Sequence, residues 1–171
     1  MVMPKRRAKV GELVAFYLNS RAFARLSGTT QKQYEKHLEC ALDTRIEGKR
    51  LEEYQARTLK ARHTNQAYQA WLKVGIRTAN YRKSALSAAW KHCMRFDIIE
   101  NDPVRLIKTE SDKPRKVKWT RDQVYQFLDA AYSDFKWRSI GLIVHMSYDL
   151  AQRVGDMRVL TWDKVDLDAQ R

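Results

Sequence analysis

The stretch that decides the fold is TANYRKSALSAAWKHCMRF, residues 78–96. Apolar and small side chains recur in it at intervals of three and four residues, which is the spacing of one face of an α-helix. The pattern predicts a long helix that begins at Thr78 and ends near Phe96. Its inward-facing side chains are expected to be Ala85, Leu86, Ala89, Trp90, Cys93 and Phe96.

Three more helices are predicted on the N-terminal side of this stretch. Apolar residues at helical spacing predict the first helix over residues 10–26. Thr30 has a capping-box partner three residues later, so the second helix is expected to begin there. Thr64 is expected to cap the third helix, which ends at Gly75. The segment 47–50 is predicted to be a loop.

A polar, charged and aperiodic segment at residues 109–118 predicts a linker between two domains. Beyond it, Thr120 also has a capping-box partner, and a helix is expected to follow. Residues 137–150 are apolar on more than one face, as a buried central helix would be, and residues 161–167 predict the approach to a strand. A unit of about 50 residues with these elements cannot bury its own core well. Residues 119–171 are therefore expected to open a larger domain.

The chain of 171 residues is strongly basic, with 33 Lys and Arg, 20 Asp and Glu, and a formal net charge of +13. The excess is concentrated in residues 1–114, which hold 23 basic and 12 acidic side chains, against 10 and 8 in residues 115–171. Residues 55–96 contain nine Lys or Arg and no acid. Because an exposed helical face ordinarily mixes both signs, this stretch indicates a polyanionic partner such as a phosphate backbone. The alternative is a surface that is merely basic.

Several other classes of protein are disfavoured. No run of about 18 apolar residues could form a helix across a bilayer, and the N-terminus lacks the apolar segment of a secretory signal. Cys40 and Cys93 are too few for a disulfide framework or a four-ligand zinc site, and the four histidines show no metal-ligand spacing. We therefore expect no metal and no cofactor, in a reducing, cytoplasmic setting.

The segment LAQRVGDMRVLTWDKVD, residues 150–166, carries the most specific motif. In order along the chain, it contains an Arg, a small residue, an acidic residue, a Leu, a Trp, and an apolar residue followed by Asp. The spacing between these residues is part of the motif. The residues in question are Arg153, Gly155, Asp156, Leu160, Trp162, Val165 and Asp166. This string resembles a signature of the tyrosine recombinases, the phage integrase family. Residues 78–103 are also similar to the last long helix and exit turn of that family's core-binding domain, and residues 119–124 to the first helix of its catalytic domain.

The resemblance implies a mainly α fold. It consists of an N-terminal SAM-like bundle of four to five helices, a linker, and the helical opening portion of an incomplete α+β catalytic domain. The expected segments are a basic N-terminal tail at 1–9, the core-binding domain at 10–108, the linker at 109–118 and the truncated catalytic domain at 119–171.

Arg153 and Asp156 are the catalytic residues that the resemblance implies. The guanidinium of Arg153 would donate two hydrogen bonds to the scissile phosphate. Asp156 occupies the family's acidic position and would orient the site; the alternative is that the two residues form an ordinary surface pair. A complete enzyme also needs a Lys on a β-hairpin, a His-x-x-Arg helix, a further His or Trp and a late Tyr nucleophile. Because these have no match here, the chain alone is expected not to cleave DNA.

The exposed residues at the starts of the second, third and fourth helices are the expected DNA contacts. Lys and Arg would supply phosphate affinity, whereas Asn and Gln can read base edges. The residues are Thr29, Thr30, Lys32, Arg62, Thr64, Asn65, Gln66, Thr78, Asn80, Arg82 and Lys83. The basic residues at 5–9 are either an arm on the duplex or a tail.

The sequence therefore predicts the DNA-binding portion of a site-specific recombinase. The full-length enzyme would cut and rejoin strands through a phosphotyrosine intermediate, as a tetramer on paired sites. The expected partner is double-stranded DNA and not a membrane. The fragment is expected to be a monomer when it is not bound to DNA. Its gene is expected to be carried by a phage or mobile element in a bacterial host. The alternatives are a non-enzymatic DNA-binding regulator related to integrases, and a basic helical protein that binds RNA or a membrane surface.

Overall fold

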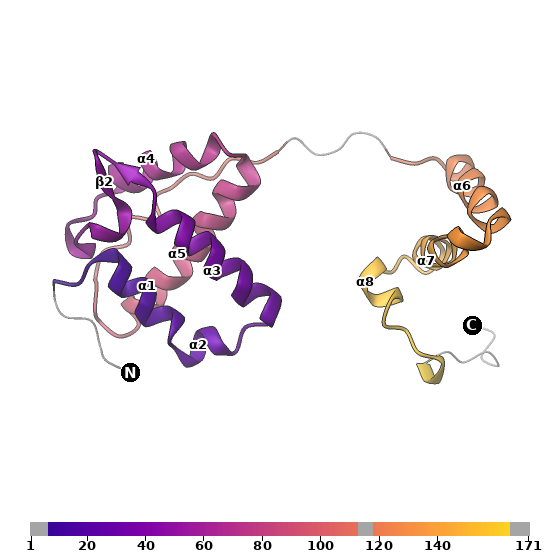
Figure 1. The fold of residues 1–171 in the computed structure, drawn as a ribbon, viewed down its shortest axis with the longest axis horizontal. Helices are drawn as coiled ribbons and strands as arrows, with labels where there is room; N and C mark the ends of the chain where they lie inside the picture. The colour runs from indigo at the N-terminus through magenta and orange to yellow at the C-terminus, as the bar shows by residue number, and fades with distance from the viewer. Residues whose placement is uncertain (1–6, 113–117, 165–171) are drawn as a thin grey trace. The chain divides into compact units, whose positions relative to one another are not determined.

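The computed structural model describes residues 7–112 and 118–164, which form two separate compact units. Helices dominate both, and the only strands among the described residues make one short hairpin, so the prediction of a mainly α fold is confirmed (Figure 1). The elements of the first unit are α1 (Val10–Leu18), α2 (Arg21–Ala24), α3 (Gly28–Leu42), β1 (Arg45–Ile46), β2 (Lys49–Arg50), η1 (Leu51–Glu53), η2 (Ala56–Thr58), α4 (Ala61–Leu72) and α5 (Ile76–Met94). Nowhere in these two ranges is a helix both long and apolar enough to cross a membrane.

Helix α5 is the centre of the first unit, because α1, α3 and α4 all pack against it. Five of its predicted inward-facing side chains are buried: Ala85, Leu86, Ala89, Trp90 and Cys93. The prediction for Phe96 is wrong, since this side chain is 44% exposed. The helix ends at Met94, so Phe96 has left the helical periodicity, and its ring lies edge-on against Phe16 instead.

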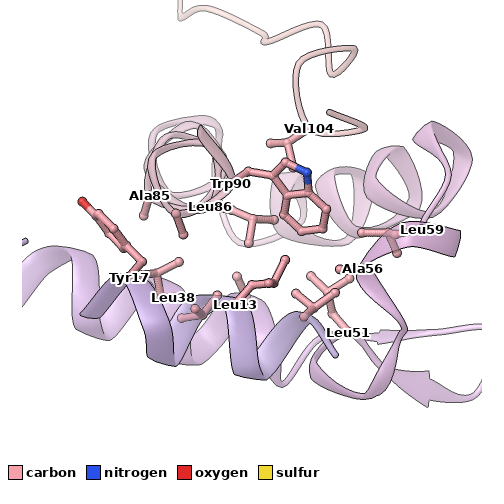
Figure 2. Packing of buried hydrophobic residues seen from close by; sticks show 14 of the residues in the cluster. Leu13, Tyr17, Leu38, Leu51, Ala56, Leu59, Ala85, Leu86, Trp90 and Val104 are labelled. Carbon is pink, nitrogen blue, oxygen red and sulfur yellow. The ribbon is translucent and has the colours of Figure 1, made fainter. Parts of the chain in front are cut away.

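The core draws side chains from every part of the first unit. In Figure 2, Leu13 of α1 and Leu38 of α3 face Leu86 and Trp90 of α5, and Leu51, Ala56, Leu59 and Val104 close the cluster at one end. The indole N–H of Trp90 donates to the carbonyl oxygen of Asn101 at 2.8 Å, which satisfies a buried donor. This bond ties α5 to the exit segment, whose Ile98, Ile99, Val104 and Ile107 are buried as well.

The predicted starts and ends of the first two helices need correction. The expected helix over 10–26 is two helices, because the Ser20 hydroxyl accepts from the backbone N–H of Phe23 and begins α2. Helix α3 begins after Ser27 rather than at Thr30, since the Ser27 hydroxyl accepts from the backbone N–H of Thr30. A Ser and a Thr three residues apart both satisfy the capping preference, and the earlier one serves as the cap.

The third and fourth helices also begin earlier than predicted. Helix α4 has Lys60 as its N-cap, so Thr64 lies within the first turns and does not cap the helix. Helix α5 follows Gly75, whose φ of 143° is open to glycine but rarely to other residues. Thr78 is therefore the third residue of α5 rather than its start.

The segment 47–50, predicted to be a loop, is the turn and second strand of a β-hairpin. Ile46 pairs with Lys49, and Arg45 with Arg50, in antiparallel register. The two residues between the strands, Glu47 and Gly48, have φ values of 51° and 80°. Two consecutive positive φ values are what a two-residue hairpin turn of this hand requires.

The second unit contains α6 (Arg121–Ser133), η3 (Phe135–Trp137), α7 (Arg138–Asp149), α8 (Val154–Met157) and η4 (Trp162–Lys164). The capping box of Thr120 and Gln123 is confirmed, with both hydrogen bonds present. Helices α6 and α7 pack where Gly141 faces Ala131, whose Cβ would lie only 3.0 Å from a Cβ added at Gly141. Residues 162–164 form a 3₁₀ turn rather than a strand, and residues 165–167 lie outside the described residues.

The predicted helix at 137–150 is present as α7, but its burial differs from the prediction. Ile140 is 45% exposed and Leu142 is 52% exposed. Within the second unit α6, η3 and α8 contact α7, and Ile143, Val144 and Met146 are half-buried. Helix α7 is therefore partly covered rather than the buried central helix that the sequence predicted.

Candidate nucleic-acid interface

Helices α3 and α5 present one continuous face. The imidazole of His37 on α3 stacks flat on the ring of Tyr81 on α5, with ring centroids 5.3 Å apart and planes inclined by 4°. Further along the same two helices, Tyr34 and Ser84 line one pocket. The stacked pair joins α3 to α5, and we call the surface that the two helices share the α3–α5 face.

The α3–α5 face is cationic. Helix α5 contributes Arg77, Lys83 and Lys91 and contains no acidic residue at all. On α3, Glu35 and Glu39 each lie two residues from His37, and two residues of an α-helix turn the chain by about 200°. The carboxylates therefore point away from the face that His37 shares with α5.

The ion pairs of the first unit lie elsewhere. Arg50 binds the carboxylates of Asp43 and Glu52 at 2.8 and 2.9 Å, beside the hairpin. No described carboxylate lies within ion-pair distance of Lys83 or Lys91. Lys83 and Lys91 are thus not paired with a carboxylate of the described residues, whereas Asp112 lines a hollow together with Arg77 and Tyr81.

The electrostatic environment of His37 reflects this excess of positive charge. Burial lowers the pKa of its imidazole, and the neighbouring cations Arg82 and Lys36 lower it further. Arg82 itself has a buried Nε atom without a hydrogen-bond partner among the described residues. A negative group placed against this part of the face would offset the effect of Arg82 and Lys36 on the pKa of His37.

Of the residues predicted at the start of α3, Thr29 lies toward this face, whereas Lys32, five residues or about 140° from His37, lies on the side of Glu35. The side chains of Thr29 and Lys32 are exposed. The hydroxyl of Thr30 is half-buried and lies 2.8 Å from that of Ser27, so it takes part in the helix cap. Thr29 and Lys32 are thus accessible, whereas Thr30 supports the helix start.

The residues predicted at the start of α5 have different roles from one another. Lys83 lines the pocket between the helices, Arg82 lies beside His37, and Thr78 is half-buried. Both polar atoms of the Asn80 side chain form hydrogen bonds. Its Oδ1 accepts from the Tyr68 hydroxyl at 2.7 Å, and its Nδ2 donates to the carbonyl of Glu110 at 2.7 Å. Asn80 therefore joins α4, α5 and the exit segment.

The residues predicted at the start of α4 lie beside the hairpin rather than on the α3–α5 face. Arg62, Asn65 and Gln66 are exposed, and Arg62 Nε lies 3.1 Å from Nε2 of His63, which faces Glu47 at 3.9 Å. Thr64 is completely buried, and its hydroxyl donates to the carbonyls of Ala61 and Pro103. A side chain in that position joins α4 to the exit segment in the interior and is not accessible to a ligand on the surface.

Sequence reasoning missed most of the polar residues along α5. The side chains that share the face beyond its first turns are Tyr81, Ser84, Ser87, Lys91 and Arg95, and Tyr34 and His37 of α3 oppose them. Their three- and four-residue spacing on α5 was available in the sequence. The partners on α3 depend on how the two helices pack, which the periodicity of each helix alone does not specify.

Arg153 and Asp156 lie at the start of the short helix α8 in the second unit. Arg153 is its N-cap residue and Asp156 is in its first turn, and both side chains are exposed. The backbone N–H of Asp156 donates a hydrogen bond to the carbonyl oxygen of Arg153 at 2.9 Å. Among the described residues 118–164, the side chains of Arg153 and Asp156 form no ion pair with each other. The last two residues of the motif, Val165 and Asp166, lie outside the described residues.

No family model matches the sequence, and no curated protein matches it either. Solved structures do match. One is a Tn1549 transposon integrase in complex with circular intermediate DNA, with 19% identity, a TM-score of 0.75, and coverage of 94% of this chain and 52% of that one. Another is a variant of that integrase in complex with transposon right end DNA, with 21% identity, a TM-score of 0.73, and coverage of 92% and 49%.

The chain thus spans about half the length of the solved structures that it matches. At this level of identity the likeness establishes the fold, and it extends over both units because more than nine-tenths of the chain is covered. The predicted resemblance to integrases is confirmed at that level: the chain has the fold of the Tn1549 transposon integrase over about half of the solved chain of that protein.

Proposed function

We propose that the chain is the DNA-binding portion of a tyrosine-type site-specific recombinase. In this proposal the first unit is the core-binding domain, and the second unit is the beginning of the catalytic domain. The observation that carries the proposal is the α3–α5 face, which gathers basic and hydroxyl side chains from a helix without acids. The matching integrase structures, which hold DNA, support the choice of duplex DNA as the partner.

The chemistry of the α3–α5 face suits a phosphate backbone. Lys and Arg attract phosphates at a distance and release condensed counterions when they bind. Hydroxyls such as those of Tyr34 and Ser84 add hydrogen bonds to phosphate oxygens. The N-terminus of α3, next to Thr29 and Lys32, adds backbone N–H groups and the positive end of a helix dipole.

The proposed contacts combine predicted residues with those that the structure adds. Thr29, Arg82 and Lys83 remain from the prediction, and Arg77, Tyr81 and Lys91 join them on the same face. Lys32 would contact DNA from the exposed start of α3. Arg62, Asn65 and Gln66 would form a second contact on the hairpin side of the unit. Because most of these groups are cations or hydroxyls, we expect them to supply affinity and register more than sequence selectivity.

The catalytic part of the proposal concerns the whole protein. Arg153 would bind the scissile phosphate, and Asp156 would orient the site without touching the phosphate. Cleavage would proceed through a phosphotyrosine intermediate on a tetramer at paired sites, with the nucleophile supplied from outside the part described here. Without that nucleophile, the 171-residue chain would bind DNA as a monomer and leave it uncut.

A binding experiment with matched variants tests the proposal. Fluorescence anisotropy would measure the affinity of the chain for a labelled duplex, with single-stranded RNA and anionic phosphatidylserine vesicles as competitors. Arg77→Gln on the α3–α5 face should weaken duplex binding several-fold, and Arg57→Gln, an equal loss of charge at an exposed position in η2, should weaken it less than twofold. Equal losses in the two variants, or stronger competition by RNA or vesicles than by duplex, would contradict the proposal.

A further inference from the structure

The α3–α5 face contains a hollow of about 450 Å³ where α1, α2, α3 and α5 meet. Its position beyond the first turns of α5 places it outside every contact predicted from the sequence except Lys83. Pockets of a few hundred Å³ are large enough for a small ligand or for part of a larger one.

The lining of this hollow is that of an anion site. Three cations, Lys83, Lys91 and Arg95, contribute to its wall, and no described carboxylate does. The hydroxyls of Ser84 and Ser87 lie between these cations along α5, because residues three, four and seven apart share a face of a helix. Cations combined with hydroxyl donors match the charge and the acceptor oxygens of a phosphate group.

Helices α1 and α3 add two phenols opposite these residues. Tyr17 and Tyr34 line the hollow together, and the pKa of Tyr17 is raised by burial and by the neighbouring Tyr34. A phenol with a raised pKa keeps its proton and acts as a hydrogen-bond donor. The hydroxyl of Tyr17 therefore complements the cations of α5 as a donor to an anion, and the hydroxyl of Tyr34 belongs to the same lining.

His92 provides an independent observation that points to a ligand. Its side chain lines the hollow and is only 6% exposed, among the rings of Phe16, Tyr17 and Phe96. Its Nε2 atom is buried and has no hydrogen-bond partner among the described residues. A buried polar atom is ordinarily satisfied, so an unpartnered one in the wall of a cationic pocket indicates that a partner is supplied from outside.

We propose that this hollow binds a phosphate group, held by Lys83, Lys91 and Arg95 together with the hydroxyls of Ser84 and Ser87. The site deepens the proposed function, because a phosphodiester of the DNA backbone is one source of such a group. A free phosphate, such as inorganic phosphate, is the other source with the same chemistry. In either case the site would lie in the middle of the α3–α5 face and would fix the position of α5 against the ligand.

The experiment uses the whole chain and the variants Lys91→Gln and Arg95→Gln, with Arg57→Gln as the matched control. Gln removes the charge and keeps helix propensity similar, and circular dichroism would verify that each variant is folded. One arm measures the affinity for a labelled duplex. The other follows the backbone amide signals of Ser84 and Ser87 by NMR during a titration with inorganic phosphate.

A phosphodiester site predicts that each pocket variant loses about tenfold in duplex affinity, with a loss under twofold for Arg57→Gln. A free-phosphate site predicts saturable shifts of the Ser84 and Ser87 signals that Lys91→Gln abolishes. Either result supports the inference and identifies the source. If neither the duplex nor the phosphate distinguishes the pocket variants from Arg57→Gln, the inference is wrong. If the unmodified chain does not bind the duplex, the proposed function is wrong. The titration with inorganic phosphate would then still test whether the hollow binds a phosphate group.

Discussion

The imidazole of His37 lies flat against the ring of Tyr81, with centroids 5.3 Å apart and planes inclined by 4°. One ring belongs to α3 and the other to α5, so the pair joins the two helices of the proposed interface. Burial, Arg82 and Lys36 all lower the pKa of His37. The stacked pair is therefore an uncharged element in a cationic surface at neutral pH.

This environment predicts that duplex binding depends on pH through His37. DNA phosphates near Arg82 and Lys36 would raise the pKa of His37, so the complex would take up protons that the unbound chain does not hold. Affinity should then increase as the pH falls from about 7.5 to about 5.5, because the protonated form binds better. Anisotropy titrations across this range would measure the trend, and His37→Gln should flatten it. A slope that is unchanged in His37→Gln would assign the pH dependence to other groups.

Asn80 is predicted to act in stability rather than in base recognition. Asn80→Ala removes the acceptor of the Tyr68 O–H and the donor to the Glu110 carbonyl, while the Glu110 N–H still donates to the Tyr68 hydroxyl. The loss of two hydrogen bonds should lower the free energy of unfolding by about 1–3 kcal/mol. Gln66→Ala, at an exposed position of α4, is the control and should change it by less than about 0.5 kcal/mol. Urea denaturation followed by circular dichroism gives both values. Unchanged stability together with a loss of sequence discrimination on DNA would return Asn80 to the role predicted from the sequence.

His92 should make the stability of the first unit sensitive to acid. Burial, and then Arg95, lower its pKa in the folded state, so the unfolded chain binds the proton more readily. The stabilising contribution of the neutral, buried imidazole is present above the unfolded pKa of about 6.5 and is lost as the pH falls below it toward the folded value. His92→Phe, which keeps an aromatic ring beside Phe16 and Phe96, should reduce this loss between pH 7 and pH 5. An identical pH profile of unfolding for the two proteins would contradict the prediction.

Arg153→Ala separates the proposed catalytic role from DNA affinity. In the protein that carries the rest of the domain, the substitution should abolish strand cleavage of a labelled site. Duplex affinity should change by less than about threefold, because one phosphate contact among many is lost. Lys164→Ala, another exposed cation of the second unit, should leave cleavage near its original rate. A collapse of DNA binding in Arg153→Ala would assign the residue to affinity or to folding instead.

Much of the helical architecture follows from local sequence patterns, and the corrections have local causes too. The buried face of α5 was predictable, because Ala85, Leu86, Ala89, Trp90 and Cys93 recur at helical spacing. The predicted start of α3 was wrong by a few residues, because Ser27 and Thr30 both have the side chain that an N-cap position prefers. The hairpin at 45–50 was missed, because two paired residues on each side give too short an alternation to detect.

The candidate site was less predictable, because it depends on contacts between distant segments. Thr64 resembles a helix cap in the sequence, but its hydroxyl donates to Pro103, 39 residues away. Asn80 resembles an exposed polar residue, but its amide bridges Tyr68 and Glu110. The identities of the predicted contacts on DNA stay predictions, as do the roles of Arg153 and Asp156.

The salt dependence of duplex binding tests the central claim most directly. If the cations of the α3–α5 face bind the phosphate backbone, log K should fall linearly with log salt. Four phosphate contacts would give a slope of about −3.6 and a loss on the order of 100-fold between about 50 and 200 mM salt. If the α3–α5 face binds the backbone, this loss is expected together with a shallower slope for Arg77→Gln than for Arg57→Gln. An affinity that stays constant over this range, or no detectable duplex binding at low salt, would contradict the central claim.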